Sequence, residues 1–226
     1  MMLPKILHYI WIGNPKTELA NRCIDSFHQF MSDYQIIEWN ESNIGELCLD
    51  DTEKKYYDQW YEKKKFAFCS DILRLHILNQ YGGVYVDCDV EFIKHLPDEF
   101  LYLPFLGRIN PQNTVCAGCI WGCNKYDSVL TKSISEFRSK LFKSGRRYGK
   151  SWIFNSFFRD MFSNDSDVLS VNNQLGYMIY PTEYFCPKNA KSGEISITDR
   201  TISIHHYALS WCDRSNNNII SSGNKL

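Results

Sequence analysis

Apolar and polar positions change their spacing along the chain in a way that predicts strands and helices in turn. Residues 5–12 are β-branched and aromatic and run into Gly13-Asn14-Pro15, which predicts a first strand that ends in a loop. Residues 17–32 have the spacing of a helix, and residues 34–39 have the composition of a second strand. The beginning of the chain therefore predicts a β-α-β unit.

The next segment predicts a helix that leads directly into a buried strand. A charged, tyrosine-rich stretch at 52–65 is expected to begin helix, and apolar residues at helical spacing continue it through 66–81. Gly82-Gly83 then ends the helix. Residues 84–90 are apolar enough to form a strand that is covered on both faces.

The remaining elements alternate in the same way. We expect strands at 100–105, 115–121, 177–180 and 195–204, helices at 127–142 and 151–162, and a polar tail from residue 215. This alternation predicts a single α/β domain over 1–214, in which helices flank a central, mostly parallel mixed sheet, followed by the tail at 215–226.

Length and composition narrow the function. The chain has 226 residues and a formal net charge of −1. We therefore expect no nucleic-acid partner, because proteins that bind nucleic acids usually present a strongly basic surface. Its nine cysteines are odd in number and scattered, which we interpret as reduced thiols in a cytoplasmic protein. The apolar run at 6–12 is too short for a signal peptide or a membrane span.

A basic segment at 131–150 allows peripheral contact with a membrane. It holds seven basic side chains against Glu136, with Leu141, Phe142 and Tyr148 interleaved. Each basic residue near an anionic membrane surface contributes about 1 kcal/mol to binding. Contact of this kind would suit a lipid-linked acceptor. A solvated helix and loop is the interpretation that we prefer.

Two aspartates give the clearest chemical signal. On a continuous strand Asp87 and Asp89 point to the same face, roughly 6.5 Å apart along the backbone. Like charges at such spacing repel unless a cation lies between them, and a hard divalent ion with oxygen ligands meets that need. The pair therefore predicts a metal site suited to a diphosphate, with a solvent-facing strand end as the alternative.

Asp71 and Arg74 are spaced i, i+3 and share one helical face. Alone they would be interpreted as a surface ion pair worth about 0.2–0.5 kcal/mol. Their helix leads through two glycines into the Asp87 strand, however, so both side chains can face the same site. There an arginine can bind phosphate with two hydrogen bonds, and an aspartate can accept hydrogen bonds from sugar hydroxyls.

These motifs together resemble a known family. The segment from Pro4 to Gly13 (PKILHYIWIG), Ser70-Asp71-x-x-Arg74, Tyr81-Gly82-Gly83-Val84-Tyr85 and Asp87-x-Asp89 are similar to the DXD-containing sugar transferases of glycosyltransferase family 32. That group includes bacterial capsule and surface-polysaccharide enzymes, Golgi initiating mannosyltransferases and clostridial glucosylating toxins. The resemblance covers residues 4–95 and recurs near the C-terminus.

The resemblance implies a Rossmann-like GT-A fold, a nucleotide-sugar donor, a bound Mn²⁺ or Mg²⁺, and transfer of a hexose with retention. The acceptor would be a saccharide or lipid-linked saccharide of polysaccharide biosynthesis, and UDP is preferred over GDP. The implied roles are base binding by Ile10, Trp11 and Ile12, sugar and phosphate contacts by Asp71 and Arg74, metal binding by Asp87 and Asp89, and closure over the diphosphate by Ser210 and Trp211. The residues expected to be catalytic are Asp71, Arg74, Asp89 and Trp211.

Other candidate ligands are weaker. Neighbouring residues on a strand point to opposite faces, so at most one of His205 and His206 can reach the metal, and we favour His206. His8 is expected to be a core histidine. Cys116-x-x-Cys119-x-x-x-Cys123 has a spacing found in metal sites but no evident fourth ligand, so we expect core thiols.

Two alternative functions stay open. In a haloacid-dehalogenase-type phosphotransferase, Asp87 would be phosphorylated and Asp89 would act as acid and base. That motif normally comes earlier in the chain, and a downstream lysine followed by paired aspartates is not evident. A non-catalytic nucleotide-sugar-binding module is the other possibility. For the transferase, attack on the same sugar face, assisted by the leaving phosphate, is the working hypothesis.

Overall fold

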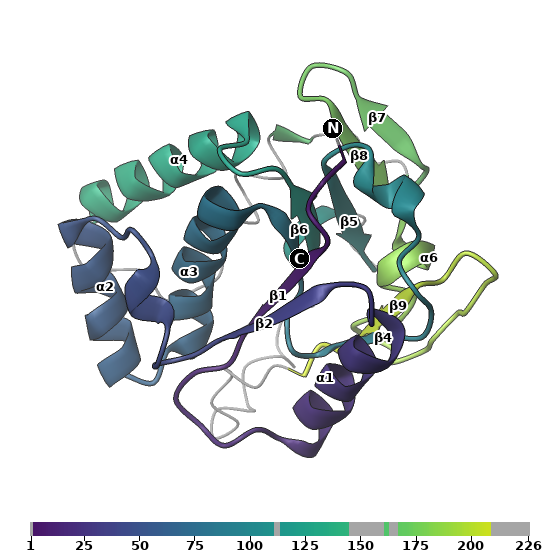
Figure 1. The fold of residues 1–226 in the computed structure, drawn as a ribbon, viewed down its shortest axis with the longest axis horizontal. Coiled ribbons are helices and arrows are strands. Elements are labelled where there is room, and N and C mark those ends of the chain that lie inside the picture. Colours follow the sequence, from purple (N-terminus) through teal and green to yellow (C-terminus); the bar gives the residue numbers. More distant parts are fainter. Residues whose placement is uncertain (1, 111–113, 145–160, 163–166, 209–226) are drawn as a thin grey trace, which may run out of the picture.

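The computed structural model describes residues 2–110, 114–144, 161–162 and 167–208, drawn in colour in Figure 1. The helices are α1 (Glu18–Phe30), α2 (Asp51–Glu62), α3 (Phe66–Tyr81), α4 (Ser128–Ser144) and α6 (Thr182–Phe185), with 3₁₀ turns at Ile44–Glu46 and Asp98–Leu101. The strands are β1 (Ile6–Ile10), β2 (Gln35–Trp39), β3 (Gly83–Tyr85), β4 (Val90–Phe92), β5 (Phe105–Ile109), β6 (Thr114–Cys123), β7 (Ser170–Asn172), β8 (Tyr177–Tyr180) and β9 (Ser203–His205). None of the described helices is long and apolar enough to span a membrane.

Seven strands form one mixed sheet in the order β2-β1-β3-β6-β5-β8-β7. The pairs β1–β2, β1–β3 and β5–β8 are parallel, and the other three pairs are antiparallel. β4 and β9 pair separately as a small antiparallel sheet. The α/β class and the central mixed sheet flanked by helices are confirmed.

The large sheet separates two hydrophobic clusters. Helices α2, α3 and α4 gather on one side of it, where Trp39, Trp60 and Leu75 are buried (Figure 1). The opposite cluster contains Phe27 of α1 together with Phe105 of β5. Each face of the sheet is thus covered, which explains why the central strands are apolar on both sides.

Two glycines set how β3 enters the sheet. Gly82 has a φ of 66° and ends α3, and Gly83 has a φ of 95°. A Cβ built on Gly83 would lie 2.6 Å from the carbonyl oxygen of Ile6, so the close approach of β3 to β1 requires glycine. Because β1 and β3 are parallel neighbours, their carboxyl ends lie at the same edge of the sheet, where α/β folds place ligands.

Some expected boundaries were wrong. The strand expected at 84–90 is divided: β3 ends at Tyr85, and Val90 begins β4 in the second sheet. The expected strand at 195–204 is reduced to β9, because only its end finds a partner in the short β4. The segment expected as a strand at 100–105 begins in the 3₁₀ turn Asp98–Leu101, is irregular at 102–104 and reaches β5 only at Phe105. The expected helix at 151–162 falls almost entirely outside the described residues, and the tail at 215–226 lies wholly outside them.

Candidate active site

The two aspartates of the motif lie in the connection between the two sheets. After β3 the chain bends, and the Val90 N–H donates to the Asp87 carbonyl at 3.1 Å. The ligand atoms of Asp87, Asp89 and His205 all lie within 4.8 Å of one another. The two carboxylates therefore converge through a chain bend, and not because they alternate along one strand.

Helix α3 supplies the first side of this site. The Arg74 guanidinium lies 3.0 Å from the Asp71 carboxylate and 3.4 Å from that of Asp87. The side chains of Arg74 and Asp71 are only 8% and 14% exposed, so this is not a surface ion pair. The Tyr85 ring lies 4.9 Å from the guanidinium carbon, and its hydroxyl donates to Asp87 at 2.8 Å.

Burial has the largest influence on the pKa values of the two aspartates on this side. It raises the pKa of Asp71 to about 7, with Arg74 opposing and Asp87 adding to the rise. Burial also raises the pKa of Asp87, which Arg74 counteracts and the Asp89 charge increases. One guanidinium thus neutralises two partly buried carboxylates incompletely, which leaves this side of the site receptive to an additional positive charge.

The second side comes from the far end of the described chain. His205 Nε2 lies 3.2 Å from one Asp89 oxygen, and the Ala208 N–H donates to the other at 2.8 Å. Burial alone would raise the pKa of Asp89, but His205 and this N–H lower it to about 2. Although burial disfavours the charged imidazole, the Asp89 carboxylate raises the pKa of His205.

The histidine facing the metal-binding aspartates is His205, not the expected His206. β9 pairs with β4 so that His205 lies opposite Val90. Alternation then turns His206 to the other side, where its Nε2 lies 2.6 Å from Glu91. Sequence reasoning recognised that only one of the two could reach the site, but the choice depends on this strand register.

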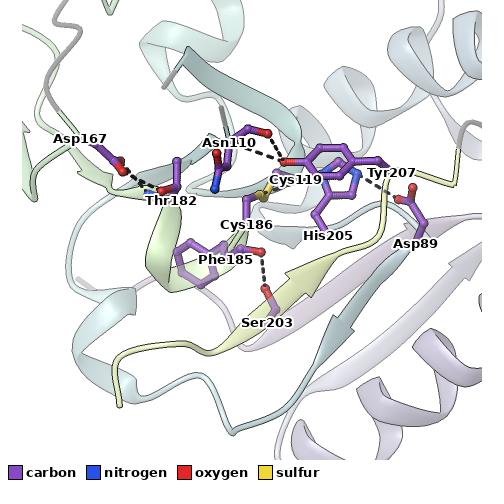
Figure 2. The surroundings of a disulfide bond; sticks show 10 residues. All are labelled: Asp89, Asn110, Cys119, Asp167, Thr182, Phe185, Cys186, Ser203, His205 and Tyr207. Carbon is purple, nitrogen blue, oxygen red and sulfur yellow. Dashed lines mark hydrogen bonds and ion pairs between the residues drawn. A yellow bond between two sulfur atoms is a disulfide. The ribbon is translucent and has the colours of Figure 1, made fainter. Parts of the chain in front are cut away.

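A disulfide lies directly behind His205. Cys119 of β6 is bonded to Cys186, whose sulfur is 3.9 Å from His205 Nδ1 (Figure 2). The Tyr207 ring lies 4.2 Å from the His205 ring and donates its hydroxyl to the Asn110 carbonyl at 3.2 Å. The expectation of reduced thiols is therefore wrong for this pair, and the cytoplasmic location inferred from it stays a prediction.

The residues expected to bind the base follow the end of β1. The side chains of Ile10 and Ile12 are buried in the core, whereas Trp11 is partly exposed. The Trp11 indole donates to the Asn14 carbonyl, and the Gly13 N–H donates to Glu41 at 2.6 Å. Among these three, Trp11 offers side-chain surface to a ligand. Ser210 and Trp211 lie outside the described residues.

Two further expectations concern residues away from the site. His8 is fully buried, and burial lowers its pKa to about 4, so it is a core histidine as expected. In the basic segment, Arg138 binds Glu53 at 2.9 Å and 3.0 Å, and contact of this segment with a membrane stays a prediction. Lys132 is exposed, and the side chains of the other five basic residues lie outside the described part.

Comparison with known proteins agrees with this geometry. Residues 17–115 match the model of the glycosyltransferase sugar-binding region containing a DXD motif. This range contains Asp71, Arg74, Asp87 and Asp89. This part of the chain, slightly less than half of it, is therefore similar to the sugar-binding region of DXD-type glycosyltransferases. This match favours the transferase over the phosphotransferase alternative.

Two relatives that match by sequence are named as glycosyltransferases. The chain is 25% identical to the "uncharacterized glycosyltransferase L373" of Acanthamoeba polyphaga mimivirus over 207 residues, 88% of this chain and 71% of that protein. Inositol phosphoceramide mannosyltransferase 3 of Schizosaccharomyces pombe is 28% identical over 115 residues, 49% of this chain and only 31% of that protein.

The fold is similar to that of two solved glycosyltransferase structures. PaToxG glycosyltransferase matches with a TM-score of 0.53 at 18% identity, covering 72% of this chain and 70% of that chain. The UDP-bound glycosyltransferase domain from the YGT toxin matches with a TM-score of 0.50 at 11% identity, covering 73% and 69%. The expected glycosyltransferase fold is thus confirmed.

Proposed function

We propose that this chain is a metal-dependent, retaining hexosyltransferase that uses a nucleotide sugar as donor. The observation that carries the proposal is the convergence of Asp87, Asp89 and His205 beside the buried Asp71–Arg74 pair. A donor of this kind presents a sugar next to a diphosphate. The Asp71–Arg74 pair offers hydrogen-bonding groups to the sugar. The carboxylates and the imidazole beside it suit a cation that binds the diphosphate.

The chemistry of the ligand atoms fits Mn²⁺ or Mg²⁺. Asp87 and Asp89 would supply carboxylate oxygens and His205 a ring nitrogen, and imidazole beside carboxylates favours Mn²⁺. When bound, such an ion stabilises the negative charge that develops on a leaving diphosphate. His205 replaces His206 as the proposed third ligand.

The protein's own side chains would orient the donor. Arg74 is already oriented by Asp71, Asp87 and the Tyr85 ring, so little rotamer entropy is lost when it binds a phosphate or sugar oxygen. Asp71, with a pKa near neutrality, can accept or donate a hydrogen bond to a sugar hydroxyl. Trp11 would contact the base, and Ser210 with Trp211 would close over the diphosphate.

Donor and acceptor follow from weaker arguments. A UDP sugar is preferred because the similar YGT toxin domain is UDP-bound in its solved structure. A GDP sugar is the competing donor, since one relative is named a mannosyltransferase. The acceptor is proposed to be a saccharide or lipid-linked saccharide of polysaccharide biosynthesis, as the family resemblance implies. Peripheral membrane contact would suit the lipid-linked case.

Thermal stability with ligands tests the proposal. The purified protein is heated with UDP, GDP and their sugars, each with Mn²⁺ or with a chelator. A ligand at a hundred times its dissociation constant adds about 2.7 kcal/mol of stability. We expect a shift that needs both a nucleotide and the metal and is lost in Asp89→Asn. A shift that persists with chelator would contradict metal dependence.

The same experiment separates the alternatives. A metal-dependent shift without hydrolysis or transfer of any donor sugar would indicate a binding module. If turnover occurs, the anomeric configuration of the first product, read by proton NMR, tests retention. An inverted product would overturn the retaining mechanism while leaving the donor site intact.

A further inference from the structure

Strand β6 is irregular where it passes the candidate site. Its pairing with β5 changes from Leu106 opposite Trp121 to Gly107 opposite Cys116. One step along β5 therefore corresponds to five steps along β6, and residues 117–120 have no counterpart on β5. Such bulges bend a strand toward one side and are frequent next to active sites.

The centre of this bulge lies against Asp87. The Asp87 N–H donates to the Gly118 carbonyl at 3.0 Å. A Cβ built on Gly118 would lie 2.6 Å from the Arg74 Nη1 atom and closer still to an Asp87 carboxylate oxygen. Real Cβ atoms essentially never show contacts under 3.0 Å. The space of the missing side chain is thus occupied by the two charged groups.

Gly118 is not required by its backbone conformation. Its φ lies outside the left-handed region that favours glycine, unlike those of Gly82 and Gly83. An alanine could adopt the same backbone, so the reason for glycine at this position is the space that it leaves. That space is next to functional groups and not in the apolar core.

We propose that Gly118 is a positioning residue for the Asp87 carboxylate and the Arg74 guanidinium. A methyl group here would displace the Asp87 oxygen from the position that converges with Asp89 and His205. The remaining room is limited, because Tyr85 and Arg74 already hold the other carboxylate oxygen. The consequence for metal affinity rests on the proposed function, whereas the steric contact does not.

Gly122 provides a matched control in the same strand. A Cβ on Gly122 would also come closer than 3.0 Å to a neighbour, but that neighbour is the buried ring of Phe105. Gly122→Ala therefore overpacks the core without touching the candidate site. Gly107→Ala, whose Cβ would lie 3.1 Å from Ile120, is a milder control in the neighbouring strand.

A double-mutant cycle tests the contact without any assumption about metal. Urea unfolding is measured for wild type, Gly118→Ala, Asp87→Ala and the double variant. We expect Gly118→Ala to lower the urea midpoint of unfolding in the wild-type background. In the Asp87→Ala background, where the carboxylate is absent, the decrease caused by Gly118→Ala should be less than half as large. For Gly122→Ala the two backgrounds should give equal losses. Equal losses for Gly118→Ala, or failure to fold in both backgrounds, would overturn the proposal.

A metal titration then tests the positioning role. Mn²⁺ binding, followed by calorimetry in the presence of UDP, should weaken about 10-fold or more in Gly118→Ala, a typical effect for residues that support a metal site. Gly122→Ala should keep wild-type affinity. Unchanged affinity in a folded Gly118→Ala protein would contradict the positioning role. Absence of Mn²⁺ binding in wild type would refute the proposed function instead, and the unfolding cycle would still decide the contact.

Discussion

The two aspartates of the motif lie in opposite surroundings, although they are two residues apart. Asp87 shares one guanidinium with Asp71, and the two side chains that bond directly to its carboxylate, Arg74 and Tyr85, come from α3 and β3. Asp89 is held by His205 and by the Ala208 N–H, a contact that spans 119 positions in sequence. One side of the site is local in sequence and the other is remote.

This difference separates two tasks. On the remote side, the His205 ring and the Ala208 N–H favour the charged form of Asp89 and lower its pKa to about 2. On the local side, burial outweighs Arg74 and raises the pKa values of Asp71 and Asp87. The remote side therefore holds Asp89 as a carboxylate that is already charged. On the local side, a bound cation would stabilise the charged forms of Asp71 and Asp87 most.

The largest expected effect is on turnover in Asp89→Asn. The amide keeps the shape of the side chain but loses the charge that the remote side stabilises. Residues that merely support a metal site change affinity or activity by about 10- to 100-fold. We therefore expect a proposed ligand to cost about 100-fold or more in donor turnover. Steady-state kinetics with the donor found by thermal shift measures this loss.

Glu91→Gln is the matched control for that variant. Glu91 lies two residues further along the chain and contacts His206 and Arg22, outside the group of converging ligands. It should retain turnover within a few-fold. Full activity in Asp89→Asn, or an equal loss in both variants, would contradict the assignment of Asp89.

The two neighbouring histidines offer a sharper test of the remote side. His205→Asn should weaken Mn²⁺ binding by about 10- to 100-fold, because its ring contacts Asp89 directly. His206→Asn should leave Mn²⁺ affinity near that of wild type, since its ring contacts Glu91. Calorimetric titration of both variants checks the difference. The reverse result would restore His206 as the proposed ligand.

On the local side, Asp71 should make the folded protein less stable as pH rises. Its pKa is about 7 when folded and about 4 when unfolded, so between these values the folded state binds more protons. Its contribution to stability is greatest below pH 4 and is lost as pH rises to 7. Allowing for solvent and relaxation, we expect a change of about 2 kcal/mol across this window.

Urea unfolding of wild type and Asp71→Asn at pH 4.5 and pH 7.5 checks this sign. The difference in unfolding free energy between the two proteins should shift in favour of the variant at the higher pH. The comparison between proteins is needed because His8, with its lowered pKa, changes wild-type stability in the opposite direction. A pH-independent difference would show that Asp71 is charged throughout.

The sequence predicted the local side better than the remote side, for a physical reason. Helical spacing placed Asp71 and Arg74 on one face, and the glycine turn placed their helix next to Asp87. These relations depend on residues close in sequence. The choice of His205 over His206 depends on the register between β4 and β9, which no local pattern encodes. The bulge at 117–120 and the disulfide across 67 positions were missed for the same reason.

The smallest effect is expected from Tyr85→Phe on the local side. This change removes the hydroxyl that donates to Asp87 but keeps the ring beside Arg74. A hydrogen bond to a charged group contributes about 1.5–3 kcal/mol, and the partial exposure of Asp87 should reduce this to about 1 kcal/mol. The Mn²⁺ concentration for half-maximal turnover should accordingly rise about 5-fold.

Tyr9→Phe separates this local effect from a general loss of stability. The Tyr9 hydroxyl also donates to a carboxylate, that of Glu38 at 2.7 Å, but from the neighbouring strand β1 and outside the converging ligands. Both variants should unfold at lower urea, whereas only Tyr85→Phe should change the Mn²⁺ dependence. Equal Mn²⁺ dependence in the two variants would mean that Arg74 alone orients Asp87, and the local side would then differ from the remote one, where both His205 and the Ala208 N–H hold the carboxylate.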